Sequence, residues 1–205
     1  MLLEPMECIL NGLDQHGWVS VPGCMNHDDS IRLAQECLAS CENGDFVSAG
    51  VGRGQGLEVR ESIRQDRVKW IQPGEESVEQ KIYLAKVDGM RLAINERFFF
   101  GLFDFECHFA MYPEGGFYKA HLDRHAGSGA RIVTVILYLN QHWQPGDGGE
   151  LKLWTTAGSR EGGYALIEPR LGTMVFFMAG DFWHEVMPTA KPRMSITGWF
   201  RRCET

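Results

Sequence analysis

The segment Arg131–Asn140, "RIVTVILYLN", decides the fold class that the sequence predicts. It is apolar and rich in β-branched residues, and glycine-containing segments flank it, which is typical of a buried β-strand. Successive side chains of a strand point to opposite faces of its sheet, so Thr134, Ile136 and Tyr138 share one face. We expect this face to be the one that lines any pocket in the protein's interior.

Further short apolar runs surround this segment from Asp104 onward, separated by turns rich in Gly, Pro and Asp. They read "FDFECHFAMYP", "GGELKLW", "GYALIEP", "GTMVFFMA", "FWHEVMP" and "MSITGWFRR". Strands at this spacing are typical of a sandwich, a jelly roll or a barrel. The sequence therefore predicts a β-core over residues from about 104 to 203.

Two helical patterns precede the predicted strands. The first, "HDDSIRLAQECLAS", has Asp28 or Asp29 as its expected N-cap, and the second is "VEQKIYLAKVDGMRLAINERFFF". The inward residues that we expect in the first helix are Ile31, Leu33, Ala34 and Leu38. No linker or internal repeat divides the chain, so we predict one domain over residues 1–205, with residues 1–103 as helical support.

Composition narrows the classes of function. The chain has 205 residues, 44% of them hydrophobic, and a formal net charge of −7. This acidic balance argues against a nucleic-acid-binding protein, because binding to the phosphate backbone requires a basic protein surface. Six cysteines without a C-x-x-C pair, no leader pattern and no membrane-length apolar run predict a reduced cytoplasmic protein.

The glycine-rich segment from Ser48 to Asp66 interrupts the regular patterns. Its glycines do not follow the G-x-G-x-x-G spacing of a dinucleotide-binding turn, because Gln55 and Leu57 stand where the third glycine is needed. Two interpretations stay open at this point: a mobile loop that closes over a substrate, and an ordinary solvated loop.

The motif "YKAHLDRHAG", residues 118–127, places His121 and Asp123 on one face of a strand. With His184 of "FWHEVMP" they form two histidines and one carboxylate, the ligand set of non-haem Fe(II) oxygenases. An H-x-D pair alone is a weak signal, since a strand histidine is more often a core residue. His125 is an alternative to His121, and His108 and His142 are alternatives to His184.

Arg193 strengthens this interpretation. It opens the last predicted strand, where alternation places Ser195, Thr197 and Trp199 on the same face. An arginine that faces a pocket needs an anionic partner, and no acidic residue lies nearby in the sequence. A carboxylate ligand could accept two parallel hydrogen bonds from it, with Tyr138 adding a hydroxyl. We therefore expect a short dicarboxylate to bridge the metal and Arg193.

These motifs resemble the 2-oxoglutarate- and Fe(II)-dependent oxygenases, and more narrowly the prolyl hydroxylase domain family typified by the hypoxia-inducible-factor prolyl hydroxylases. The segments that carry the resemblance are "YPEGGFYKAHLD", "VTVILYLN", "GGELKLW", "IEPRLGTMVFF", "HEVMP" and "RMSITGWF", with "RQDRVKWI" upstream. The resemblance begins at about Val47. It implies a mainly β fold with supporting helices, namely a double-stranded β-helix (jelly roll). The length of the chain resembles that of bacterial members of the family.

The resemblance also implies a role for each matching residue. His121, Asp123 and His184 correspond to the Fe(II) ligands, and Arg193 and Tyr138 to the residues that bind the distal carboxylate of 2-oxoglutarate. The remaining cosubstrate positions are Tyr112, Ile136, Leu151, Val186 and Thr197, and the substrate positions are Arg64, Arg131 and Trp199. Two departures from the family pattern stand out: the segment from Tyr112 to His121 is one residue shorter than in the animal enzymes, and His108 occupies a pocket position that is usually apolar in the family.

The activity that the resemblance implies consumes 2-oxoglutarate and O2 and hydroxylates C4 of a prolyl residue, with ascorbate as a possible reductant. The implied partner is a proline-containing protein, and bacterial relatives point to a translation elongation factor; neither nucleic acid nor a membrane is expected. Two alternatives stay open. A nucleic-acid demethylase of the same superfamily needs a basic substrate face and a second cofactor arginine. A non-catalytic metal-binding jelly-roll module needs no dicarboxylate clamp.

Overall fold

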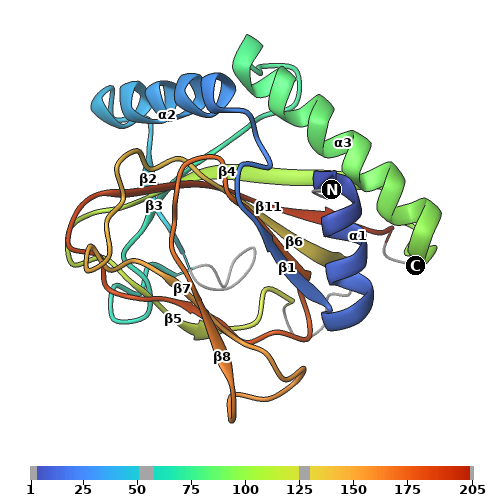
Figure 1. Cartoon of the computed structure of the whole chain (residues 1–205). Coiled ribbons are helices and arrows are strands. Elements are labelled where there is room, and N and C mark those ends of the chain that lie inside the picture. The colour runs from blue at the N-terminus through green and yellow to red at the C-terminus, as the bar shows by residue number, and fades with distance from the viewer. Residues whose placement is uncertain (1–3, 51–57, 125–129, 204–205) are drawn as a thin grey trace.

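Two antiparallel sheets that face each other form the body of the protein, and three helices cover the outer face of the larger sheet (Figure 1). The computed structural model describes residues 4–50, 58–124 and 130–203. The helices are α1 (Pro5–His16), α2 (His27–Glu42) and α3 (Val78–Phe98). This arrangement confirms the predicted jelly roll with supporting helices.

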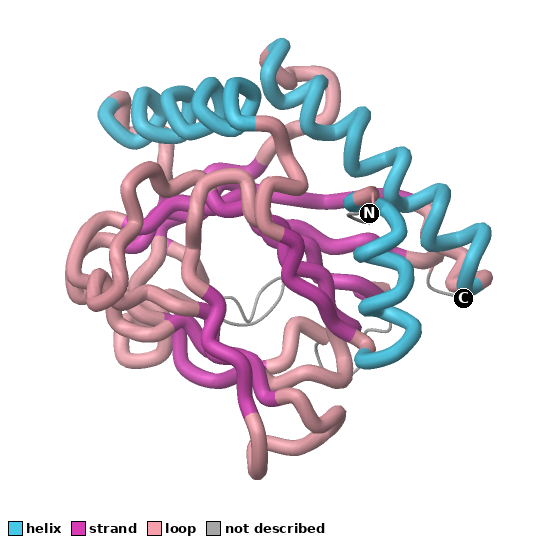
Figure 2. Tube along the Cα trace, in the orientation of Figure 1, coloured by secondary structure: helices cyan, strands magenta, loops and turns pink. Residues whose placement is uncertain are grey.

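The larger sheet contains seven strands in the described part of the chain. Their spatial order is β1 (Trp18–Val21), β9 (Met174–Met178), β6 (Arg131–Tyr138), β11 (Arg193–Arg201), β4 (Asp104–Tyr112), β3 (Arg67–Trp70) and β2 (Val47–Ser48). The smaller sheet has the order β5 (Tyr118–His121), β10 (His184–Val186), β7 (Leu151–Trp154) and β8 (Tyr164–Ile167). Figure 2 shows the smaller sheet on the side of the larger sheet that is opposite to the helices.

The two faces of β6 belong to two different cores, as its alternation predicts. Val133, Val135 and Leu137 pack in the core between the larger sheet and the helices. Ile136 and Tyr138 pack in the second core, between the two sheets. The inward face of the jelly roll is therefore the face predicted from the sequence.

Two details of α2 correct the prediction. The helix begins at His27, before the predicted caps, and its N-cap is Asn26, whose side-chain oxygen accepts the backbone N–H of Asp29 at 2.8 Å. The buried stripe passes through Leu33 and Cys37, whereas Leu38 is 42% exposed. The predicted cap at Asp28 or Asp29 and the predicted burial of Leu38 were wrong, because a residue before the quoted pattern caps the helix and sets its phase.

Three strands within residues 1–103 were not predicted. β1, β2 and β3 have at most four residues each, too few for a clear alternation, and they extend the larger sheet at both edges. The pairing of β3 with β4 places Trp70 opposite His108. Within the described residues, no helix combines the length and apolarity needed to cross a membrane.

Candidate active site

A cavity of about 230 Å³ lies between the two sheets. All the predicted site residues except Tyr138 line it, which brings together segments that are far apart in the sequence. These lining residues are Arg64, Tyr112, His121, Asp123, Arg131, Ile136, Leu151, His184, Val186, Arg193, Thr197 and Trp199. Tyr138 is fully buried behind Arg193.

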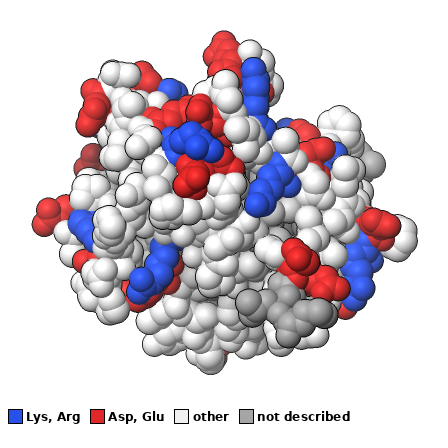
Figure 3. All heavy atoms as spheres, turned by 45° about the horizontal axis from the view of Figure 1, so that its top comes forward, with Lys and Arg blue, Asp and Glu red and all other residues white. Residues whose placement is uncertain are grey.

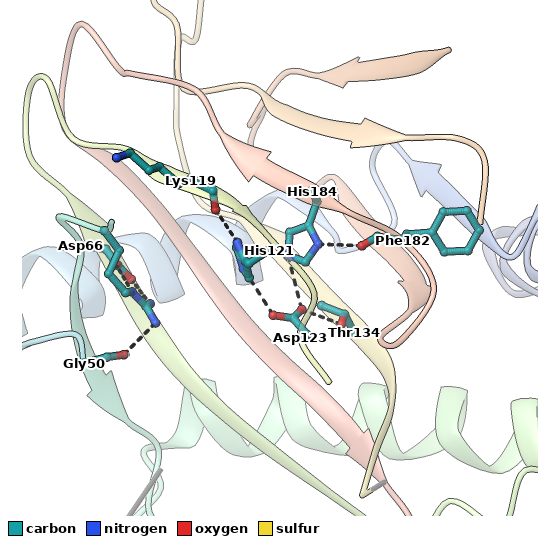
Figure 4. A network of polar contacts seen from close by, with 9 residues as sticks. Gly50, Asp66, Lys119, His121, Asp123, Thr134, Phe182 and His184 are labelled. Atoms are coloured by element: carbon teal, nitrogen blue, oxygen red, sulfur yellow. Dashed lines mark hydrogen bonds and ion pairs between the residues drawn. The ribbon is translucent and has the colours of Figure 1, made fainter. Parts of the chain in front are cut away.

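His121, Asp123 and His184 form the one cluster of potential metal ligands found among the described residues. Their ligand atoms lie within 4.8 Å of one another, and each histidine Nε2 is 3.5 Å from a carboxylate oxygen of Asp123. The pairing of β5 with β10 places His121 directly opposite His184, so backbone register brings the two imidazoles together (Figure 4). Two imidazole nitrogens and one carboxylate oxygen suit Fe(II) and leave positions open for other ligands.

Backbone carbonyls orient both imidazoles. The Nδ1 atom of His121 lies 2.8 Å from the carbonyl oxygen of Lys119, and that of His184 lies 3.0 Å from the carbonyl oxygen of Phe182. With Nδ1–H donating to a carbonyl, each Nε2 presents a lone pair to the metal position. Burial and the neighbouring His121 lower the pKa of His184 to about 4, which favours the neutral imidazole that binds metals.

The Asp123 carboxylate is also held in place. Thr134 donates a hydrogen bond of 2.7 Å from its hydroxyl to Oδ2 of Asp123. Burial alone would raise the pKa of Asp123, but its interactions with the neighbouring imidazoles of His184 and His121 and this hydrogen bond outweigh it and hold the pKa well below its usual range. Asp123 is therefore an anionic ligand under ordinary conditions.

The competing histidines lie elsewhere or outside the described residues. His142 is exposed in a turn, and His108 lines the cavity but does not belong to the ligand cluster. His125 and residues 51–57 of the glycine-rich segment lie outside the described residues, so the structure does not address the predictions that concern them.

Arg193 occupies the end of the cavity away from the metal ligands. It is 2% exposed, and its Nε donates a hydrogen bond of 2.8 Å to the carbonyl oxygen of Gly149. Its guanidinium carbon lies 5.0 Å from the ring of Tyr112 and 5.1 Å from that of Tyr138. No acidic side chain within the described residues pairs with it, and a buried arginine without a counter-ion is costly. The site therefore has the unsatisfied positive charge that the sequence predicts.

The two other predicted arginines have acidic partners. Arg64 makes a bidentate pair with Asp66, with N–O distances of 2.7 and 2.5 Å. Arg131 donates to Glu106 at 2.9 Å, and its guanidinium carbon lies 3.4 Å from the ring centroid of Trp199. These charges are neutralised locally, so they shape the cavity wall without adding a free charge to it.

Several contributors were not identified from the sequence. The alternation along β6 puts Thr134 on the inward face, two residues before Ile136, but it does not show that the Thr134 hydroxyl binds Asp123. The ring of Tyr118 stacks on His121 at 3.6 Å between centroids and receives the guanidinium of Arg64 at 4.2 Å. Asp66 is buried and pairs with Arg64. These contacts depend on cross-strand register, which the sequence does not display.

Comparison with known proteins agrees with this geometry. Residues 107–201 match the sequence model of the 2OG-Fe(II) oxygenase superfamily. A crystal structure of a Pseudomonas putida prolyl-4-hydroxylase is 40% identical, with a TM-score of 0.87 over 97% of this chain and 100% of that chain. A Trichoplax adhaerens prolyl hydroxylase, solved with a hypoxia-inducible-factor peptide, is 27% identical, with a TM-score of 0.83 over 96% of this chain and 88% of that chain.

A relative from Caenorhabditis elegans, a hypoxia-inducible factor prolyl hydroxylase, is 26% identical over 209 residues. The match covers 95% of this chain but spans only 28% of that longer protein. The full-length similarity to the Pseudomonas putida structure is the stronger observation, because both chains are covered almost completely. The chain therefore belongs to the prolyl hydroxylase family of 2-oxoglutarate- and Fe(II)-dependent oxygenases.

Proposed function

We propose that this protein is a 2-oxoglutarate-dependent dioxygenase that hydroxylates C4 of a prolyl residue in a partner protein. One observation carries the proposal: a single cavity has a histidine–aspartate–histidine cluster at one end and a buried arginine without an acidic partner at the other. A metal ion would bind to the histidine–aspartate–histidine cluster, and a carboxylate would pair with the buried arginine. A short dicarboxylate that chelates the metal satisfies both.

The spacing along β6 supports a ligand of this length. Tyr138 lies beside Arg193, and Thr134, four residues away, binds Asp123. At about 3.3 Å per residue these two levels are about 13 Å apart. A five-carbon dicarboxylate fits this span when a metal–oxygen bond of about 2 Å and an arginine–carboxylate hydrogen bond of about 2.8 Å are added. Ile136 lies midway and provides an apolar wall.

The residues of the chain then have defined tasks. His121, Asp123 and His184 would hold Fe(II), which together with 2-oxoglutarate and O2 supplies the oxidising power for C–H hydroxylation. Arg193 and Tyr138 would bind the distal carboxylate, while Tyr112, Leu151, Val186 and Thr197 enclose the carbon chain. Burial of these walls excludes water from the metal end, which protects a reactive site from side reactions.

The wall formed by Arg64, Arg131 and Trp199 is the proposed substrate side. Trp70, 40% exposed, and Val47, 62% exposed, line the same cavity and place apolar surface next to this wall. Such a surface suits an extended peptide whose prolyl ring enters the cavity. A translation elongation factor with an exposed proline-containing loop is the first partner that we propose to test.

Neither alternative is favoured by a specific contact. A nucleic-acid demethylase needs a basic surface, whereas the chain has a formal net charge of −7 and its helix-covered side carries Lys and Arg interspersed with Asp and Glu (Figure 3). A second free arginine for the cosubstrate is also not found in the described part of the cavity, because Arg64 and Arg131 have acidic partners. A purely structural metal site would leave the burial of Arg193 unexplained.

The test couples two products. Fe(II)-loaded protein is incubated with 2-oxoglutarate, O2, ascorbate and a purified translation elongation factor, and succinate and hydroxylated prolyl peptides are quantified by mass spectrometry. We expect both products in equal amounts, and neither with the Arg193→Ala variant. If the elongation factor is unmodified, a library of proline-containing peptides replaces it. Succinate without any prolyl product would overturn the prolyl assignment, and no succinate in either arm would overturn the enzyme assignment.

A further inference from the structure

His108 is a polar residue in the cavity wall to which no task has been assigned. It is 4% exposed and lines the cavity. Its ring packs against two tryptophans that also contact each other, with centroid distances of 4.8 Å to Trp70 and 5.5 Å to Trp199. These aromatic neighbours fix the position of the imidazole, so its nitrogens point in defined directions.

Neither ring nitrogen of His108 has a hydrogen-bond partner among the described residues, and Nδ1 is completely enclosed. An enclosed polar atom without a partner costs about 1–3 kcal/mol, so such atoms are rare unless a ligand or a water satisfies the group. The neighbouring Trp199 has an enclosed Nε1–H that also lacks a partner, and it can only donate. The two atoms do not form a hydrogen bond with each other, but Trp199 packs against His108 and offers only an N–H, so a lone pair on Nδ1 is compatible with it whereas a second N–H is not. This favours the tautomer in which the proton is on Nε2 and faces the cavity.

The register of the larger sheet fixes the depth of His108 in the cavity. His108 lies opposite Thr197, which in turn lies opposite Ile136. Ile136 is midway between the Tyr138 level, where Arg193 lies, and the Thr134 level, where Asp123 is held. His108 therefore stands beside the middle of the span between the arginine and the metal ligands.

We propose that His108 binds the cosubstrate: its Nε2–H donates a hydrogen bond to the 2-oxo-acid end of 2-oxoglutarate, which would extend from the metal toward the middle of the span. This inference rests on the proposed function, because it requires a 2-oxo acid chelated in the cavity. Arg193 and Tyr138 hold the distal end, and His108 holds the end that would otherwise be free to rotate about the metal. Two fixed ends define the orientation of the carbon chain.

The charges around His108 agree with a neutral donor. Burial lowers its pKa to about 3, and the carboxylates of Asp66 and Asp123 oppose this effect while Arg64 and Arg131 reinforce it. A neutral imidazole can donate one hydrogen bond to an anion without placing a second buried charge beside Arg64 and Arg131. An apolar residue at this position, in contrast, could enclose the cosubstrate but could not orient it.

The experiment measures the dissociation constant of 2-oxoglutarate by calorimetry on the Mn(II)-loaded enzyme, which binds the cosubstrate without turnover. Three variants separate donor position from packing. His108→Leu removes both nitrogens, His108→Gln places an amide near the former Nε2, and His108→Asn places an amide near the former Nδ1. The dissociation constant of Mn(II) is the control, since His108 does not belong to the ligand cluster.

We expect His108→Leu and His108→Asn to weaken 2-oxoglutarate binding about 10-fold, the effect of losing one hydrogen bond to a charged group. We expect His108→Gln to remain within about threefold of the wild type, and Mn(II) affinity to stay unchanged in all three. Wild-type affinity in His108→Leu, or equal losses in the Leu and Gln variants, would overturn the role of His108 but leave the proposed function intact. Absence of 2-oxoglutarate binding in the wild type would overturn both.

Discussion

The guanidinium carbon of Arg193 lies 5.1 Å from the ring centroid of Tyr138, and both side chains are buried without an acidic partner in the described residues. The hydroxyl of Tyr138 is enclosed next to the Arg193 guanidinium, and its own O–H proton has no acceptor. Burial raises the pKa of Tyr138 to about 12, although the charge of Arg193 opposes this effect. The hydroxyl is thus a neutral donor next to a positive charge, and both groups are available to one carboxylate.

Removal of this hydroxyl should affect stability and binding in opposite directions. Tyr138→Phe eliminates an unsatisfied buried group, so we expect the free energy of unfolding of the ligand-free protein to rise by about 1 kcal/mol. The same change should weaken 2-oxoglutarate binding about 10-fold, because one hydrogen bond to a carboxylate is lost. Urea unfolding and calorimetry measure the two quantities. Loss of stability together with unchanged binding would contradict the assigned role.

The Thr134 hydroxyl should control metal affinity through Asp123. Thr134→Val preserves the shape of the side chain but removes the donor to Oδ2, and changes of this kind weaken metal binding about 10- to 100-fold. Thr134→Ser retains a hydroxyl and should stay close to the wild type. The free Mn(II) signal in electron paramagnetic resonance reports both affinities. Equal affinities of the Val and Ser variants would show that Thr134 does not orient the ligand.

The burial of His108 predicts a loss of stability in acid. An unfolded histidine has a pKa of about 6.5, whereas burial lowers the pKa of His108 to about 3. Between these values the unfolded chain binds a proton that the native residue does not, so the free energy of unfolding falls as the pH decreases from about 6.5 toward 3. One such group contributes about 1.4 kcal/mol per pH unit.

His108→Leu isolates this contribution from that of the other buried groups. The metal-free variant should lose less stability than the metal-free wild type when urea unfolding is compared at pH 7 and pH 5. The difference arises because leucine does not titrate. Identical losses in the two proteins would mean that native His108 takes up its proton in the ordinary range.

Two glycines should respond oppositely to alanine. A Cβ on Gly198, in the centre of β11, would lie 2.4 Å from Cζ of Phe105 and 2.6 Å from Cβ of Cys107, so Gly198→Ala should destabilise the protein by about 1–3 kcal/mol. Gly89 is exposed in α3, and its added Cβ meets no atom within 4 Å. Gly89→Ala should therefore stabilise the protein by about 1 kcal/mol through helix propensity. Thermal unfolding measures both changes.

The parts of the site that the sequence predicts are those that alternation along one strand determines. Ile136 and Tyr138 on β6 and Arg193 and Thr197 on β11 face the interior because a period of two fixes their side. The H-x-D motif is a different case, because β5 ends at His121 and Asp123 lies just beyond it in a bend, so the spacing brought out the right pair although the predicted strand did not extend to Asp123. The distant histidine, His184, was selected through its neighbourhood and the family resemblance, since no periodicity connects β5 with β10.

The remaining features depend on pairings between strands. The stacking of Tyr118 on His121 and the bond from Thr134 to Asp123 join elements through the tertiary fold. The two tryptophans beside His108 come from β3 and β11, which lie on either side of β4. Very short strands such as β2 have too few residues to show an alternation of polar and apolar side chains. The register between strands, which creates these contacts, is therefore visible only in the structure.

The most direct test of the central claim is the visible charge-transfer band of anaerobic protein loaded with Fe(II) and 2-oxoglutarate. We predict a weak band in the wild type that is lost in His184→Ala, through loss of the metal, and strongly weakened in Arg193→Ala, through loss of the carboxylate partner. Gly89→Ala, far from the cavity, serves as the matched control and should retain the band. Wild-type protein that binds Fe(II) but shows no band at saturating 2-oxoglutarate would contradict the account, because the cavity would then hold a metal without chelating the dicarboxylate.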